Sequence, residues 1–114
     1  RREALRERCL AAHEELARRL LARRQYRRAI EILRRGLDMD DLRESFYRQL
    51  MRAYALSGQR DQALEQYQRC AEVLERELGT IPSPATTELH QRILAHPAFE
   101  EGRVSTWFLD DLQG

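Results

Sequence analysis

The chain has 114 residues, of which 34% are charged and 42% are hydrophobic, with a formal net charge of +1. This length suits one domain with one modest core, no segment is apolar enough for a membrane span, and the charge neither favours nor excludes nucleic acid as a partner. The few Pro and Gly residues and the abundance of Leu, Ala, Arg and Glu indicate a mostly helical chain. Because the first residue is Arg1 and no leader-like segment follows, we expect a fragment of a longer cytoplasmic protein.

Apolar residues recur at three- and four-residue steps in five segments, and this period predicts five helices. The first helix should run from about residue 3 to about residue 23, and the fifth should be the shortest. Short connections between the helices require neighbours in the chain to be antiparallel. The expected core faces, in chain order, are Leu5, Cys9, Ala12, Leu16 and Leu20; Tyr26, Ala29, Ile30, Leu33 and Leu37; Leu42, Phe46, Leu50, Ala53 and Tyr54; Leu64, Tyr67, Ala71, Leu74 and Leu78; and Thr86, Leu89 and Ile93.

Residues between these segments have the character of helix ends. The sequence DLRE has the form of a capping box, in which Asp41 would cap the third helix. Gly58 and Gly79 can adopt the left-handed conformation that ends a helix, and Ser83 followed by Pro84 suits the start of the fifth helix. These expected ends agree with the periodic segments on either side.

The segment HEELARRLLARRQYRRAIEILRRG matches YRQLMRAYALSGQRDQALEQYQRC at an offset of 34 residues. Ala29 aligns with Ala63, where a small residue lets the second helix of a pair approach the first. A helical hairpin repeated every 34 residues is the signature of the tetratricopeptide repeat, whose pairs stack because one pair cannot cover its own apolar face. We therefore predict an all-α fold of antiparallel hairpins of this type rather than a plain four-helix bundle. Arg24 aligns with Gly58, and a left-handed backbone there would cost Arg24 roughly 1 kcal/mol relative to Gly.

Four motifs in this pattern resemble those of a known family. They are LRE at a helix start, LMRA in the third helix, G-x-x-x-x-A-L-x-x-Y, and L-x-x-E-L-G-x-x-P-S-x-x-T-x-x-L. Together they resemble the bacterial transcriptional activator domain of actinomycete antibiotic regulatory proteins, over about residues 4–95, although Asp41 stands where the family commonly has Pro. We accordingly assign residues 1–96 to a tetratricopeptide-like domain of this family and residues 97–114 to a C-terminal tail, which we expect to be docked.

The resemblance implies a protein-interaction module of a bacterial transcriptional activator. In the family this domain follows a winged-helix DNA-binding domain, and it is thought to act in self-association, as in a homodimer, or in contact with the transcription machinery. DNA would then be bound only through that other domain, and we expect no membrane partner. Two alternatives stay open: an interaction module of a signal-transduction ATPase, and direct DNA or anion binding by the Arg-rich first hairpin.

No motif in the sequence predicts catalysis or a bound metal. There is no Gly-rich phosphate loop and no H-E-x-x-H, and His13, His90 and His96 lack the spacing of metal ligands. We therefore expect neither an enzyme nor a cofactor. Cys9 and Cys70 fall on apolar helical faces, which predicts two reduced core thiols, and a disulfide between them is the less favoured alternative.

Arginines around the first expected turn are the strongest polar signal, since residues 1–28 contain ten Arg and four Glu. One interpretation is phosphate contact, to DNA or to an acidic partner. The interpretation that we favour is a solvated helix surface with the ion pairs Glu14–Arg18 and Glu15–Arg19. The candidate anion contacts are Arg18, Arg19, Arg23, Arg24, Arg27 and Arg28.

The tail contains three adjacent apolar residues, Trp107, Phe108 and Leu109, and exposing all of them would leave an apolar patch. We expect Trp107 and Phe108 to be buried, either in a groove of the repeat array or against a second copy or a following domain. The groove would be formed by the first helix of each pair, which carries Tyr47 and Tyr54, and these tyrosines or the residues beside them would line it. These four aromatic residues are the candidate partner-binding groove, and a linker is the alternative.

Overall fold

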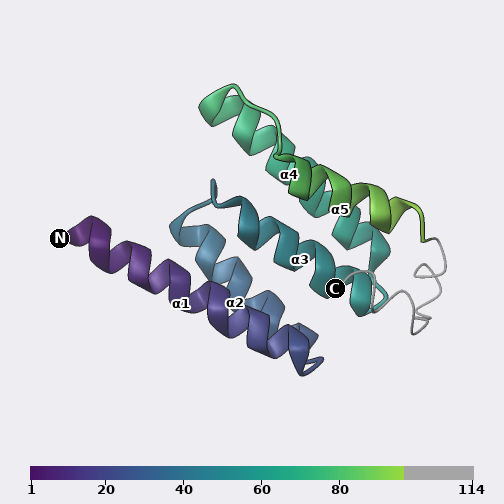
Figure 1. Cartoon of the computed structure of the whole chain (residues 1–114), viewed down its shortest axis with the longest axis horizontal. Helices are drawn as coiled ribbons and strands as arrows, with labels where there is room; N and C mark the ends of the chain where they lie inside the picture. The colour runs from purple at the N-terminus through teal and green to yellow at the C-terminus, as the bar shows by residue number, and fades with distance from the viewer. Residues whose placement is uncertain (97–114) are drawn as a thin grey trace.

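The computed structural model of the protein describes residues 1–96, and this part of the chain contains five α-helices and no strand. Figure 1 shows α1 and α2 as one antiparallel pair and α3 and α4 as a second, with α5 packed beside α3 and α4. The predicted all-α fold of antiparallel hairpins is confirmed. In chain order the helices are α1 (Arg2–Ala22), α2 (Tyr26–Met39), α3 (Glu44–Leu56), α4 (Arg60–Leu78) and α5 (Pro84–Leu94).

The turns inside the two hairpins have the same backbone geometry. In the first turn, the N–H of Gln25 donates to the carbonyl of Leu20 at 2.8 Å, and the N–H of Arg24 donates to the carbonyl of Leu21 at 3.0 Å. The equivalent bonds recur 34 residues later at 2.7 and 3.1 Å. This pair of bonds is the Schellman motif, which needs one left-handed residue. That residue is Arg24 in the first turn, with φ of 60°, and Gly58 in the second, with φ of 82°.

The core extends through all five helices, and the small residues of both hairpin seams are inside it. Ala29 and Ala63 are fully buried, as the repeat predicts. The predicted face of α5 is also confirmed, because Thr86, Leu89 and Ile93 are all buried. The predicted core faces agree less well with the structure at the helix ends. The predicted burial of Leu78, the last apolar residue of α4, is wrong because its side chain is 57% exposed.

The predicted core face of α1 is wrong over most of its length. Leu5 and Leu16 are 59% and 44% exposed, and Cys9 is exposed as well. Figure 1 shows the N-terminal end of α1 projecting beyond the other helices, and residues 1–9 are all exposed. The helix carries apolar residues on two adjacent faces, so periodicity alone could not decide which of them is buried. The buried residues of α1 are Leu10, Ala17, Leu20 and Leu21.

The capping box predicted for α3 does not form. The helix begins at Glu44, and the preceding residue, Arg43, makes no side-chain cap. Asp41 stands two residues too early, and its neighbour Asp40 accepts a hydrogen bond from the N–H of Leu42 at 3.0 Å. Glu44 makes no capping-box contact because its carboxylate reaches α5.

The other predicted helix ends are confirmed. Gly79 ends α4 with φ of 65°, and Gly58 follows α3 in the left-handed region. Ser83 is the residue before α5 and Pro84 is the first residue of that helix, although the Ser83 hydroxyl does not cap it.

Candidate functional site

In the part of the chain that the structure describes, residues of α1, α3 and α5 line a groove of about 730 Å³. Four arginines from these three helices line it, and we call it the arginine groove. Its apolar residues include Leu21 and Leu56, whose side chains are 8% and 5% exposed. Among residues 1–96 the lining is Glu14, Arg18, Leu21, Ala22, Ser45, Arg48, Gln49, Arg52, Leu56 and Arg92.

Hydrogen bonds between helices hold the walls of this groove. Glu14 of α1 accepts from Ser45 Oγ at 2.8 Å and from Arg43 Nε at 2.9 Å. At the position 34 residues later, Arg48 of α3 donates to Thr86 Oγ1 of α5 at 2.9 Å. The equivalent positions Glu14 and Arg48 therefore bond to a hydroxyl in the first turn of α3 and of α5, respectively. These two bonds fix the spacing of the three helices that line the groove.

The carboxylate of Glu44 joins α3 to the start of α5. It accepts hydrogen bonds from the Ser83 N–H at 3.0 Å, from Ser83 Oγ at 3.1 Å and from Thr86 Oγ1 at 2.6 Å. Burial alone would raise the pKa of Glu44, but these hydrogen bonds outweigh it and hold the pKa below its ordinary value. A charged carboxylate at the start of α5 also faces the positive end of that helix dipole.

Positive charge is concentrated around Arg52. Burial, together with the charges of Arg48 and Arg92, lowers the pKa of the Arg52 guanidinium. The carboxylate in the groove lining belongs to Glu14, which α3 already engages. The groove therefore presents guanidinium groups from three helices. Two of them have acidic neighbours outside the lining, because Arg18 pairs with Glu15 at 2.5 Å and Arg48 lies 3.9 Å from Glu44.

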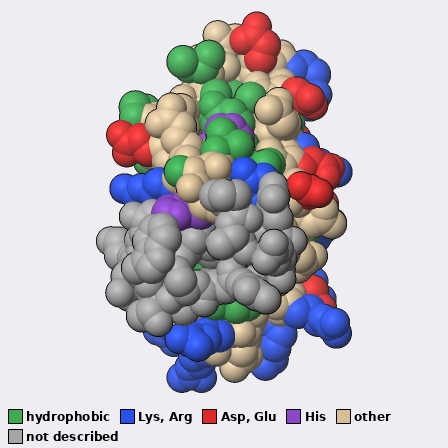
Figure 2. All heavy atoms as spheres, turned by 90° about the vertical axis from the view of Figure 1, so that its right-hand side faces the viewer, with side chains coloured by type: hydrophobic (Ala, Val, Ile, Leu, Met, Phe, Trp, Pro, Cys, Tyr) green, Lys and Arg blue, Asp and Glu red, His purple; other side chains and the backbone are tan. Residues whose placement is uncertain are grey.

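The six arginines predicted as anion contacts are not brought together in one site. Figure 2 shows mainly basic side chains at its lower edge, where the α1–α2 turn lies. Arg18 and Arg19 both pair with Glu15, at 2.5 and 3.0 Å, so the predicted Glu15–Arg19 pair is confirmed. The predicted Glu14–Arg18 pair is wrong, because Glu14 reaches α3 instead. The six divide between a second pocket (Arg24, Arg27, Arg28), the arginine groove (Arg18) and neither of the two (Arg19, Arg23).

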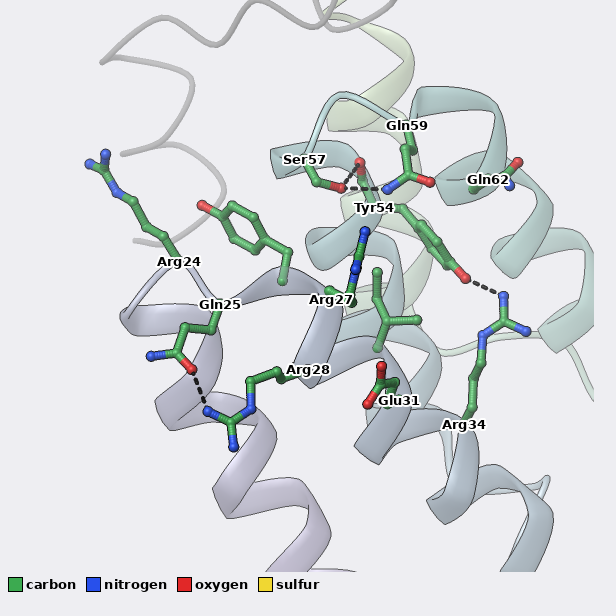
Figure 3. Close-up of a pocket in the computed structure, with 12 residues that line it drawn as sticks. Arg24, Gln25, Arg27, Arg28, Glu31, Arg34, Tyr54, Ser57, Gln59 and Gln62 are labelled. Atoms are coloured by element: carbon green, nitrogen blue, oxygen red, sulfur yellow. Dashed lines mark hydrogen bonds between the residues drawn. The ribbon is translucent and has the colours of Figure 1, made fainter.

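This second pocket, of about 800 Å³, lies beside the α1–α2 and α3–α4 turns, and we call it the turn pocket (Figure 3). Arg34 donates to the Tyr54 hydroxyl, and Arg28 donates to the amide oxygen of Gln25 at 3.2 Å. Figure 3 shows Arg27 projecting toward the α3–α4 turn, whereas Arg24 extends away from Arg34. The turn pocket is thus basic but open, with its cations spread around the rim. It is lined by Arg24, Gln25, Tyr26, Arg27, Arg28, Ile30, Glu31, Arg34, Tyr54, Ser57, Gln59 and Gln62.

The two tyrosines predicted to line a partner groove lie in the core. Tyr47 and Tyr54 are each only 4% exposed, and the Tyr47 hydroxyl donates to the carbonyl of Asp41 at 2.9 Å. Of the residues beside these tyrosines, Arg48 lines the arginine groove, whereas Ala53 and Ala55 are fully buried. Trp107 and Phe108 lie outside the described residues.

Sequence reasoning missed the arginines that line the groove on α3 and α5. Arg48 and Arg52 lie one helical turn apart, and this i,i+4 spacing was the available local signal. Arg92 joins them only because α5 packs against α3, and that contact is not readable from the local sequence. The groove is therefore a product of tertiary packing.

The thiols and other candidate ligands form no site among the described residues. Cys9 and Cys70 are both free, and the prediction of two core thiols is confirmed only for Cys70, whose burial raises its pKa to about 12. Residues 1–96 contain no group of three His, Cys, Asp or Glu residues that could hold a metal ion. Over the same residues, none of the helices combines the length and the hydropathy needed to cross a membrane.

Comparison with known proteins shows one family. The model of the bacterial transcriptional activator domain matches residues 1–94. The transcriptional regulatory protein MoaR1 of Mycobacterium tuberculosis is 32% identical over 109 residues, covering 94% of this chain and 35% of the relative. MoaR1 of Mycobacterium bovis is 31% identical over 103 residues, covering 89% of this chain and 33% of the relative. The chain thus spans about a third of the length of these curated relatives, and no solved structure matches it.

Proposed function

Because the chain belongs to the bacterial transcriptional activator domain family, we propose that it is the protein-interaction module of a transcriptional regulator. Its role is to contact another protein, either a second copy of itself or a component of the transcription machinery, without catalysing a reaction. A separate domain of the same regulator binds the DNA. The names of the relatives, both transcriptional regulatory proteins, support the regulatory part of this proposal.

The arginine groove is the observation that supports contact with a protein. Three successive helices form its walls, and side-chain hydrogen bonds such as Glu14 to Ser45 and Arg48 to Thr86 hold them in place. A groove whose walls are fixed before binding loses little conformational entropy when a partner enters it. Apolar and charged groups lie side by side in it, which suits a protein segment better than a small metabolite.

A second candidate function is anion or DNA contact by the first hairpin. It rests on the turn pocket, where Arg24, Arg27 and Arg28 lie within one open surface. Binding of this kind would depend on phosphate charge and would weaken steeply as salt is raised. It would also be largely independent of DNA sequence, because contacts to phosphate carry no sequence information directly.

Two measurements on the 114-residue chain test the proposed function. Light scattering over a range of concentrations measures self-association, and a binding assay with purified RNA polymerase measures contact with the transcription machinery. We expect at least one of these to be positive, and we expect no sequence-specific shift of promoter DNA at physiological salt. Sequence-specific DNA binding by the chain alone, with neither protein contact detected, would overturn the proposal.

A further inference from the structure

We propose that the arginine groove binds an acidic peptide segment of a partner protein, in which carboxylate side chains flank an apolar residue. This inference rests on the proposed interaction function and names the surface that carries it. The partner is identified only by chemistry: carboxylates for the guanidinium groups and an apolar side chain for the leucines.

The placement of the cations is the first argument. Arg18 comes from α1, Arg48 and Arg52 from α3, and Arg92 from α5, so guanidinium groups approach one groove from three helices. They are close enough that the charges of Arg48 and Arg92 disfavour the protonated form of Arg52, which is also partly buried. Arg18 pairs with Glu15 at 2.5 Å and Arg48 lies 3.9 Å from Glu44, so acidic neighbours offset part of this charge. An anionic occupant relieves the repulsion that remains around Arg52.

The chemistry of the lining favours a peptide over nucleic acid. Guanidinium forks bind carboxylates with two parallel hydrogen bonds, so they can recognise Asp and Glu side chains in defined positions. Leu21 and Leu56 also line the groove, although their side chains are only 8% and 5% exposed, so they offer an apolar side chain a small contact area that a phosphate backbone would not use. Among the described residues, no aromatic side chain lines the groove as a stacking platform for single-stranded bases.

The rigidity of the groove is the third argument. The Glu14–Ser45 and Arg48–Thr86 hydrogen bonds hold α1, α3 and α5 at a fixed spacing, and the Glu44 carboxylate secures the start of α5. Arg48 is therefore oriented before any partner arrives, with its side chain only 24% exposed. A cation that is already ordered loses less entropy on binding than a mobile surface arginine.

The test measures binding of synthetic peptides to the whole 114-residue chain by fluorescence anisotropy. The acidic probe is a labelled peptide of repeated Leu-Asp-Asp units, and the matched probe replaces each Asp with Asn. We expect the acidic probe to bind with an affinity that falls as salt is raised, and the Asn probe to bind at least on the order of tenfold more weakly, because charge-assisted hydrogen bonds are lost.

Two variants locate the binding surface. Arg92→Gln removes one groove cation from an exposed position of α5 and should weaken the acidic probe on the order of tenfold. Arg35→Gln removes an equally exposed arginine of α2 that does not line the groove, and it should leave the affinity unchanged. Both variants should melt within a degree or two of the wild-type chain, which shows that neither acts through unfolding.

Several outcomes would overturn the assignment. Equal binding of the Asp and Asn probes, or equal effects of the two variants, would remove the groove as the site. Displacement of the acidic probe by duplex DNA in the wild type but not in Arg92→Gln would make nucleic acid the occupant. Tighter binding when Asp110 and Asp111 are replaced by Asn would make the chain's own tail the occupant. If the chain contacts itself or RNA polymerase and Arg92→Gln leaves that contact unchanged, the groove assignment fails while the proposed interaction function stands.

Discussion

The two hairpins share a backbone but differ in how much of their first helix is buried. α3 buries nine of its 13 residues, whereas α1 buries four of its 21. The turns have equivalent hydrogen bonds, and the seam residues Ala29 and Ala63 are both fully buried. The difference arises from the neighbours, because α3 contacts all four other helices while α1 contacts mainly α2 and α3. The repeat encodes a hairpin, and the position of that hairpin in the array decides which of its residues are covered.

The aligned residues Leu16 and Leu50 differ strongly in the exposed fraction of their side chains. Leu50 is 1% exposed and Leu16 is 44% exposed. We expect Leu50→Ala to lower the free energy of unfolding by about 2–5 kcal/mol, since it leaves a cavity in the core. Leu16→Ala should cost less than about 1 kcal/mol. Urea denaturation of both variants checks this, and equal losses would mean that the outer face of α1 is covered in solution.

Gly36 and Phe46 mark where the first hairpin meets the second. A Cβ atom on Gly36 would lie 2.6 Å from Phe46 Cε2, and the Phe46 ring is fully buried. Gly36→Ala should therefore lower the free energy of unfolding by about 1–3 kcal/mol, although Ala is the better helix former. The double variant with Phe46→Leu tests this cause. Gly36→Ala should cost less stability in the Phe46→Leu background than in the wild type, because Leu is smaller than the Phe ring that the new Cβ atom meets. Strict additivity of the two losses would contradict the steric explanation.

Glu44 aligns with Leu10 of the first hairpin, so the same repeat position is apolar in one hairpin and charged in the other. Glu44→Gln keeps an acceptor for the Ser83 N–H but removes the charge, and we expect a loss of about 1 kcal/mol in the free energy of unfolding at neutral pH. Chemical denaturation of the wild type and the variant at matched pH measures this difference.

The same variant predicts a pH dependence. The folded-state pKa of Glu44 lies below its unfolded value, so its contribution to stability is fully present above the unfolded pKa of about 4.3 and is lost as pH falls through the folded pKa. Between pH 5 and pH 3 the wild type should therefore lose more stability than Glu44→Gln. Parallel stability curves over that range would show that the carboxylate does not hold α5 in its charged form.

The smallest expected effect concerns the two turns, which differ in their left-handed residue. Gly58→Ala should lower the free energy of unfolding by about 1 kcal/mol, because a side chain is strained at this positive φ. Arg24→Gly relieves the same strain but gives the unfolded chain more freedom, so a net gain below about 1 kcal/mol is expected. Thermal melts of the two variants should shift in opposite directions, and a loss in both would mean that the Arg24 side chain stabilises the first turn.

Local features of the chain were predictable because each depends on residues close together in sequence. The helix period, Gly79 and Pro84 gave the number of helices and most of their ends, and the 34-residue offset gave the hairpins and their buried seam. Arg24 aligns with Gly58, and the structure gives both residues a positive φ. In each case the energy involved belongs to one turn or one hairpin, so a short stretch of sequence carries enough information.

Which faces are covered, and what the groove contains, were decided by contacts between distant segments. Glu44 satisfies Ser83 and Thr86 across 39 and 42 residues, and this competition with the expected local capping box is invisible until α5 is docked. Arg48 and Arg92 meet around the groove for the same reason. A carboxylate accepts hydrogen bonds from whichever donors the fold brings within reach, and Arg92 comes near Arg52 only because α5 packs against α3. The sequence by itself determined the repeating hairpins, and the tertiary structure alone decided which of their side chains converge.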